Sequence, residues 1–121
     1  MAKQYKLSAE ELQPLVAAGR TCIATDRITV EGLPVRFMYR EDPIGHSDSG
    51  WRFLSGLETD AYMEVAGHQG QHELNFLANC DRAIIEFLDA PIGSAFQKPE
   101  DARAPFEPVT DWEPDEDEPQ E

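Results

Sequence analysis

Long apolar runs are missing from this chain of 121 residues. No uninterrupted apolar stretch approaches the roughly 20 residues that a membrane-spanning helix needs. The first 15 residues, MAKQYKLSAEELQPL, also lack the apolar segment typical of a signal peptide. The sequence therefore predicts a soluble, cytoplasmic protein with no membrane partner.

Cysteine is scarce, with only two residues in the chain. Cys22 lies inside an apolar, strand-like run, and Cys80 ends a helix-like one. This is the pattern of buried free thiols, and a reducing cytosol disfavours a disulfide between them. A buried Cys22 also lacks the histidine and the electropositive surroundings that a catalytic thiol needs.

Basic residues are few: 10 Lys and Arg stand against 24 Asp and Glu, a net charge of -14. Nucleic acid is therefore an unfavourable partner, because its phosphates would be repelled, and a basic protein surface is the natural complement. Residues 99–121 alone carry -9, and the rest of the chain carries -5. The end of the chain is rich in proline and shows no apolar periodicity. The sequence therefore predicts one domain over residues 1–109 and a disordered acidic tail over 110–121.

Motifs for catalysis or metal binding are weak. The segment GHSDSG (45–50) is one residue too long for the G-x-S-x-G turn of a hydrolase, and is better explained as a loop. His68 and His72 are four residues apart, as two ligands on one helix face would be, but Gly67 and Gly70 indicate a turn. No phosphate-binding loop or dinucleotide fingerprint is present. We expect no enzyme activity, no cofactor and no metal.

The start of the chain predicts a helix. Ser8 and Glu11 form a capping box, so the helix should begin at Ala9 and end by Gly19. Pro14 is discordant, because beyond the first turn it removes a backbone donor, and it predicts a kink or a late start.

The remaining pattern predicts an α+β fold with a small, mostly antiparallel sheet and several short helices. In the run VRFMYR (35–40), alternate residues should face opposite sides of the sheet, one more buried than the other. The last strand should lie at an edge, because it contains Pro108. The expected strands cover residues 21–25, 35–40, 51–55, 94–97 and 106–109, and the expected helices cover about 60–66, 73–79 and 81–90.

Aromatic and arginine side chains cluster around the run SGWRF (49–53). One interpretation is a core strand, in which Trp51 and Phe53 are buried and Arg52 pairs with a local acid. The other is a recognition surface, since Trp, Tyr and Arg most often anchor interfaces. Both interpretations stay open. The predicted partner-binding residues are Tyr39, Arg40, Asp48, Trp51 and Arg52.

Several motifs resemble a bacterial family, formerly labelled a domain of unknown function, that is assigned to the immunity proteins of polymorphic toxin systems. The resemblance covers about residues 22–109. It implies an α+β domain with a role in neutralising a toxin, and it implies no catalytic residues. The motifs are YRE (39–41), DSGWRF (48–53), SG (55–56), LN (74–75), AN (78–79) and LDAPIGSAF (88–96).

Two functions from different classes follow. The first is a non-catalytic immunity protein that binds a toxin directly, and its acidity suits a basic toxin domain. The second is a stand-alone cytosolic domain that binds a ligand or regulates another protein. A toxin gene beside this one would favour the first.

Overall fold

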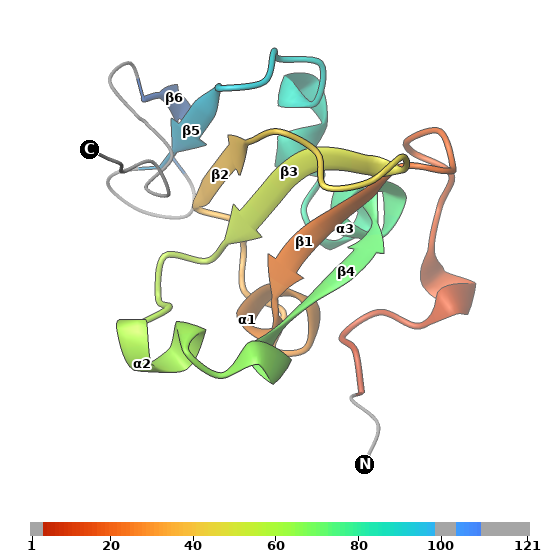
Figure 1. The fold of residues 1–121 in the computed structure, drawn as a ribbon. Coiled ribbons are helices and arrows are strands. Elements are labelled where there is room, and N and C mark those ends of the chain that lie inside the picture. The colour runs from red at the N-terminus through yellow and green to blue at the C-terminus, as the bar shows by residue number, and fades with distance from the viewer. Residues whose placement is uncertain (1–3, 99–103, 110–121) are drawn as a thin grey trace.

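A computed structural model describes residues 4–98 and 104–109. Its centre is a six-stranded sheet with the order β4-β1-β3-β2-β5-β6 (Figure 1). Among the described residues four strand pairs are antiparallel, and β1 with β3 is parallel. The predicted α+β fold with a mostly antiparallel sheet is confirmed. The strands are β1 (Thr21–Thr25), β2 (Phe37–Arg40), β3 (Asp48–Leu54), β4 (Gln69–Glu73), β5 (Ala95–Gln97) and β6 (Glu107–Pro108).

The helices are short, and the two that cover the sheet come from one stretch of chain. In the view of Figure 1, α3 and η3 lie behind the sheet, whereas α2 lies beside its lower end. The helices predicted from about residues 60 and 81 are present but shorter than expected, and the helix predicted over about 73–79 is present one residue later. The α-helices are α1 (Asp26–Thr29), α2 (Asp60–Met63) and α3 (Leu74–Cys80), and the 3-10 helices are η1 (Ala9–Glu11), η2 (Ala66–His68) and η3 (Arg82–Phe87).

The N-terminal helix starts where the sequence predicts and ends much earlier. The Glu11 carboxylate accepts the Ser8 backbone N–H at 2.8 Å, which is one half of the predicted capping box. The helix then stops at Glu11 instead of continuing toward Gly19. Pro14 explains part of this difference, because a helix cannot use its missing N–H.

Two asparagines of α3 explain the rest. The side-chain oxygen of Asn75 accepts the backbone N–H groups of Leu15 and Val16 at 2.8 and 2.9 Å. The Asn79 side chain binds both the N–H and the C=O of Gln13. These amides therefore satisfy the backbone groups that a longer helix would have satisfied internally.

Two predictions about loops are wrong. Strand β3 begins at Asp48, so only the first half of the segment 45–50 is a loop. Strand β4 occupies residues 69–73, where the glycines suggested a turn, because its pairing with β1 supplies the backbone hydrogen bonds that its polar sequence does not predict. His68 and His72 consequently lie in different elements, η2 and β4.

The core lies between the sheet and α3. Met38, Trp51 and Phe53 of the sheet and Leu74 and Leu77 of α3 are at most 1% exposed. The indole N–H of Trp51 donates to the Leu88 carbonyl oxygen at 3.1 Å, so its polar atom is satisfied inside the core. The predicted tail, residues 110–121, lies outside the described residues.

Candidate functional site

The strand register assigns side chains to two faces of the sheet. Met38 is opposite Phe53, and this pair faces the core. The alternate pairs, Phe37 with Leu54 and Tyr39 with Arg52, point to the other side. The predicted alternation in β2 is confirmed, and its more buried side is the one that carries Met38.

We call the second side the open face, because α3 and η3 cover only the first (Figure 1). Its central side chains are Ile23, Phe37, Tyr39, Arg52 and Leu54. Four of these are half-buried, and only Arg52 is fully buried. A sheet face this rich in large apolar side chains is unusual unless another surface covers it.

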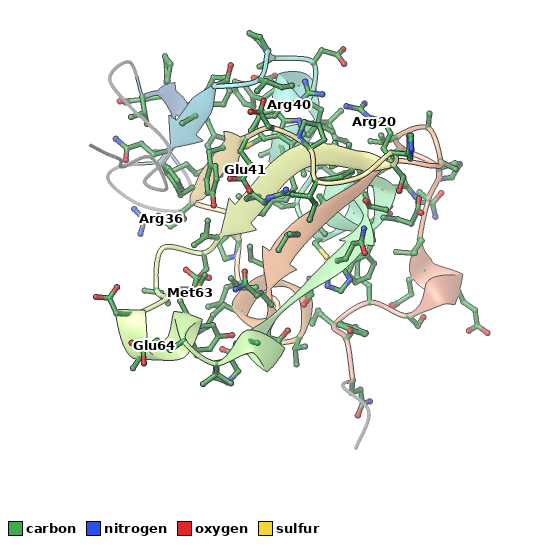
Figure 2. The ribbon with its side chains drawn as sticks, in the orientation of Figure 1. Arg20, Arg36, Arg40, Glu41, Met63 and Glu64 are labelled. Carbon is green, nitrogen blue, oxygen red and sulfur yellow. The ribbon has the colours of Figure 1, made fainter. Side chains whose placement is uncertain are left out.

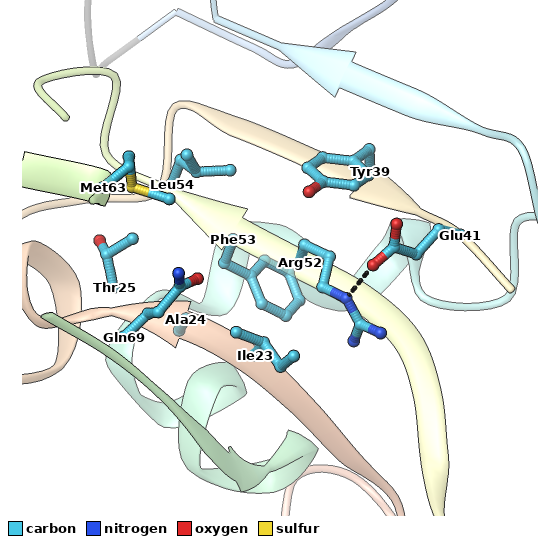
Figure 3. Close-up of a pocket in the computed structure, with 10 residues that line it drawn as sticks. All are labelled: Ile23, Ala24, Thr25, Tyr39, Glu41, Arg52, Phe53, Leu54, Met63 and Gln69. Atoms are coloured by element: carbon cyan, nitrogen blue, oxygen red, sulfur yellow. Dashed lines mark hydrogen bonds and ion pairs between the residues drawn. The ribbon is translucent and has the colours of Figure 1, made fainter. Parts of the chain in front are cut away.

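A groove of about 120 Å³ crosses the open face between the β1 and β2 sides of β3 (Figure 3). Ile23 and Gln69 form one wall, Tyr39 and Leu54 form the other, and Met63 closes one end. A second cavity of about 280 Å³ adjoins it and shares Ile23 and Gln69 with it. Its other lining residues are Ile44, Asp48, Gly70 and Gln71.

Three charged side chains interact at one end of the groove, where Glu41 and Arg52 line the groove and Asp48 lines the second cavity. Arg52 Nε donates to Glu41 Oε2 at 2.6 Å, and Arg52 Nη2 donates to Asp48 Oδ2 at 2.8 Å. The hydrogen bonds from Arg52 hold the pKa of the Asp48 carboxyl well below its usual range. Burial alone would lower the pKa of Arg52, but its bonds to Asp48 and Glu41 outweigh burial and raise it. We call these three residues the triad, and its net charge is negative.

Glycine 50 sets the position of Glu41 within the triad. Gly50 has φ +89°, and a Cβ there would overlap the carbonyl oxygen of Glu41. The Glu41 N–H donates to the Gly50 carbonyl at 2.9 Å, which closes the end of the β2–β3 hairpin. The close backbone approach that only glycine permits therefore places the Glu41 carboxylate beside Arg52.

The opposite end of the groove is held by Glu58, in the loop that leads to α2. Its carboxylate accepts the Thr25 hydroxyl at 2.5 Å and the Ser55 backbone N–H at 2.9 Å. Burial works against ionisation here, but the hydrogen bonds from Ser55 and Thr25 lower the pKa of Glu58. This anchor ties the loop to β1 and brings Met63 next to the end of β3 (Figure 2).

The five predicted partner-binding residues fall into different environments. Trp51 is 0% exposed, and Asp48 and Arg52 are 8% and 4% exposed. Arg40 donates to the carbonyls of Ser49 and Ala90 and lies near the Trp51 ring, while Tyr39 is half-buried on the open face. The core-strand interpretation therefore accounts for Trp51 and Arg52. Partner binding by the five stays a prediction.

Sequence reasoning predicted only Tyr39 and Arg52 among the residues that line the groove, and those it missed include Ile23, Glu41, Leu54, Met63 and Gln69. Period-two alternation could have found Ile23 and Leu54, because each adjoins a residue of the core face along its strand. Nothing local could have found Gln69, because β4 was not predicted.

The described residues contain neither a membrane-spanning helix nor a metal-binding cluster. No helix in 4–98 or 104–109 is long and apolar enough to cross a membrane. Over the same residues, no three His, Cys, Asp or Glu side chains gather where they could hold a metal ion.

Comparison with protein families matches residues 22–107 to the immunity protein Imm33 domain. The chain belongs to this family. The predicted resemblance to an immunity protein family is thus confirmed. The Imm33 domain begins in β1 and ends in β6, so it contains the groove and the triad, and it leaves out the segment that Asn75 and Asn79 hold. No curated protein and no solved structure matches the chain.

Proposed function

We propose that this protein neutralises a bacterial toxin by binding it directly, without catalysis, in the cytoplasm of the cell that it protects. The observation that carries the proposal is the match of residues 22–107 to an immunity protein domain. Cys22 and Cys80 are free thiols, which suits a reducing compartment.

The open face is the surface that we assign to the toxin. It presents half-buried apolar and aromatic side chains, among them Ile23, Tyr39 and Leu54, around two adjoining cavities. Binding energy at interfaces concentrates on such residues when a partner excludes water from them. Trp51 supports this face from the core, and Arg52 lies within it and holds Asp48 and Glu41 in place.

The toxin surface that fits this face is basic. The chain carries a net charge of -14, of which residues 1–98 carry -5, and the triad places a local negative charge beside the groove. Opposite charge on the toxin would accelerate association and discriminate against other partners. The association rate should consequently fall as the salt concentration rises.

The test pairs this protein with the toxin domain encoded by the neighbouring gene. Co-expression should restore growth to cells that make the toxin, and the purified proteins should form a complex in calorimetry. Tyr39→Ala should weaken binding tenfold or more, the effect of removing an interface anchor. The matched control is Tyr5→Ala, because Tyr5 is 41% exposed and packs beside His72 and Phe76, away from the groove.

Two results would contradict different parts of the proposal. A folded protein that neither protects cells nor forms a complex would exclude neutralisation by binding. Equal affinity for the Tyr39→Ala and Tyr5→Ala variants would show that the toxin binds elsewhere.

A further inference from the structure

The groove on the open face mixes apolar and polar side chains along its walls and is negative at one end. Ile23, Leu54 and Met63 line its walls, and the Glu41 carboxylate lies at the end opposite Met63 (Figure 3). The ring of Tyr39 borders the same groove. A ligand that fills it needs a long apolar stem and a polar head.

The charge at that end is not neutralised within the protein. Arg52 forms ion pairs with two carboxylates, those of Asp48 and Glu41. The Asp48 side chain is 4% exposed, whereas that of Glu41 is 31% exposed. The excess negative charge is therefore accessible at Glu41. Arg52 binds Oε2 of Glu41, and the described residues provide no hydrogen-bond partner for Oε1.

A second hydrogen-bonding group lies toward the other end of the groove, beside Thr25 (Figure 3). The side-chain amide of Gln69 also lacks a hydrogen-bond partner within residues 4–98 and 104–109. The groove thus combines apolar walls, an aromatic ring, an accessible carboxylate and an amide.

We infer that this groove receives one arginine side chain from the toxin. The methylene stem packs between Ile23 and Leu54, and the guanidinium donates to Glu41 Oε1 while it lies against the Tyr39 ring. The inference rests on the proposed function, because it takes the toxin as the source of the arginine.

Other occupants fit the groove less well. A carboxylate would be repelled by Glu41, and a purely apolar side chain would cover that charge without pairing it. A lysine ammonium is compact and strongly hydrated, so it gains less from an aromatic ring than a planar guanidinium does. The positive charge of Arg52 does not oppose a guanidinium, because two carboxylates already offset it.

The first experiment needs no toxin. The full-length, ¹⁵N-labelled protein is titrated with N-acetylarginine methylamide, and the amide signals of Ile23, Leu54 and Gln69 are followed. Saturable shifts at these positions are expected in the millimolar range. The citrulline analogue has the same shape without the charge, and it should shift the signals at least tenfold less at equal concentration. The lysine analogue should bind more weakly than arginine.

Two variants locate the effect within the groove. Glu41→Gln should weaken binding of the arginine probe at least tenfold, while the dispersed amide spectrum shows that the protein stays folded. Asp42→Asn removes the neighbouring exposed carboxylate, which does not line the groove, and should leave the affinity unchanged. Tyr39→Leu keeps an apolar side chain without the ring and should weaken the arginine probe more than the lysine probe.

Equal shifts from arginine and citrulline, or shifts confined to residues outside the groove, would overturn the inference. Equal affinity for arginine and lysine would overturn the choice of the guanidinium.

With the toxin, Glu41→Gln should raise the dissociation constant at least tenfold and Asp42→Asn should not. A tight toxin complex that Glu41→Gln leaves unchanged would reject the groove and keep the proposed function. Arginine binding without any toxin complex would keep the groove as a guanidinium site and would reject the toxin as the source of the arginine.

Discussion

The two faces of the sheet are built from the same strands, yet they have different roles. On the core face, Met38, Trp51 and Phe53 are at most 1% exposed beneath α3 and η3. On the open face, the neighbouring residues Phe37, Tyr39 and Leu54 remain half-buried although they are also large and apolar. Within residues 4–98 and 104–109, the helices therefore cover one face of the sheet and leave large apolar side chains half-exposed on the other, which is the face that we propose binds the toxin.

The largest difference between the faces should appear when one aromatic residue is removed from each. Trp51→Ala should lower the free energy of unfolding by about 3–5 kcal/mol, because it leaves a core cavity. It also removes the donor to the Leu88 carbonyl. Tyr39→Ala should cost about 1 kcal/mol, since its side chain is partly solvated already. Urea denaturation of both variants measures the contrast, and similar losses would show that the open face is as structural as the core.

Arg52 belongs to the open face but also stabilises the fold, because it pairs with the buried Asp48 carboxylate. Arg52→Met should cost about 3 kcal/mol, because it leaves the buried Asp48 carboxylate without its partner. Adding Asp48→Asn should recover part of that loss, as the uncompensated charge is then gone. Glu41→Gln should cost less than about 1 kcal/mol, because Glu41 is more exposed. If the stability losses of Arg52→Met and Asp48→Asn simply add in the double variant, this explanation is contradicted.

Acid should destabilise the protein partly through Asp48. In the folded state the pKa of Asp48 is lowered by Arg52, whereas the unfolded chain takes up a proton near the ordinary value of 3.8. The stabilisation is therefore fully present above about pH 5 and is lost progressively as the pH falls through 3.8 and below. Asp48→Asn should flatten the stability curve in that range. Parallel curves for the two proteins would assign the acid sensitivity to other carboxyls, of which Glu58 is the first candidate.

The smallest effect on stability is expected for a leucine of the open face. Leu54→Ala should change the free energy of unfolding by about 1 kcal/mol or less, whereas Leu77→Ala in α3 should cost about 2–5 kcal/mol. Thermal melting compares the two, and calorimetry with the toxin should show the opposite order. A Leu54→Ala variant that binds the toxin normally would remove this residue from the interface.

Local sequence was enough to determine several parts of the structure. The β-rich run TCIAT predicted β1 at its observed bounds, and a helix begins after Asp81, whose side chain accepts the Ala83 N–H. The burial of Trp51 and Phe53 followed from the core-strand interpretation. These features depend on side chains within a few residues of each other, and such spacings are visible in a sequence. The family, too, was recognisable from motifs in their order along the chain.

Tertiary contacts decided the rest. The helix predicted after Ser8 gives way to extended chain because Asn75 and Asn79, about 60 residues away, bind its backbone. Strand β4 exists because β1 pairs with it. Period two predicts that a strand has two faces but not which face the helices will cover, since that depends on where α3 returns to the sheet. The open face, and Glu41 beside Arg52 within it, therefore became visible only in the folded chain.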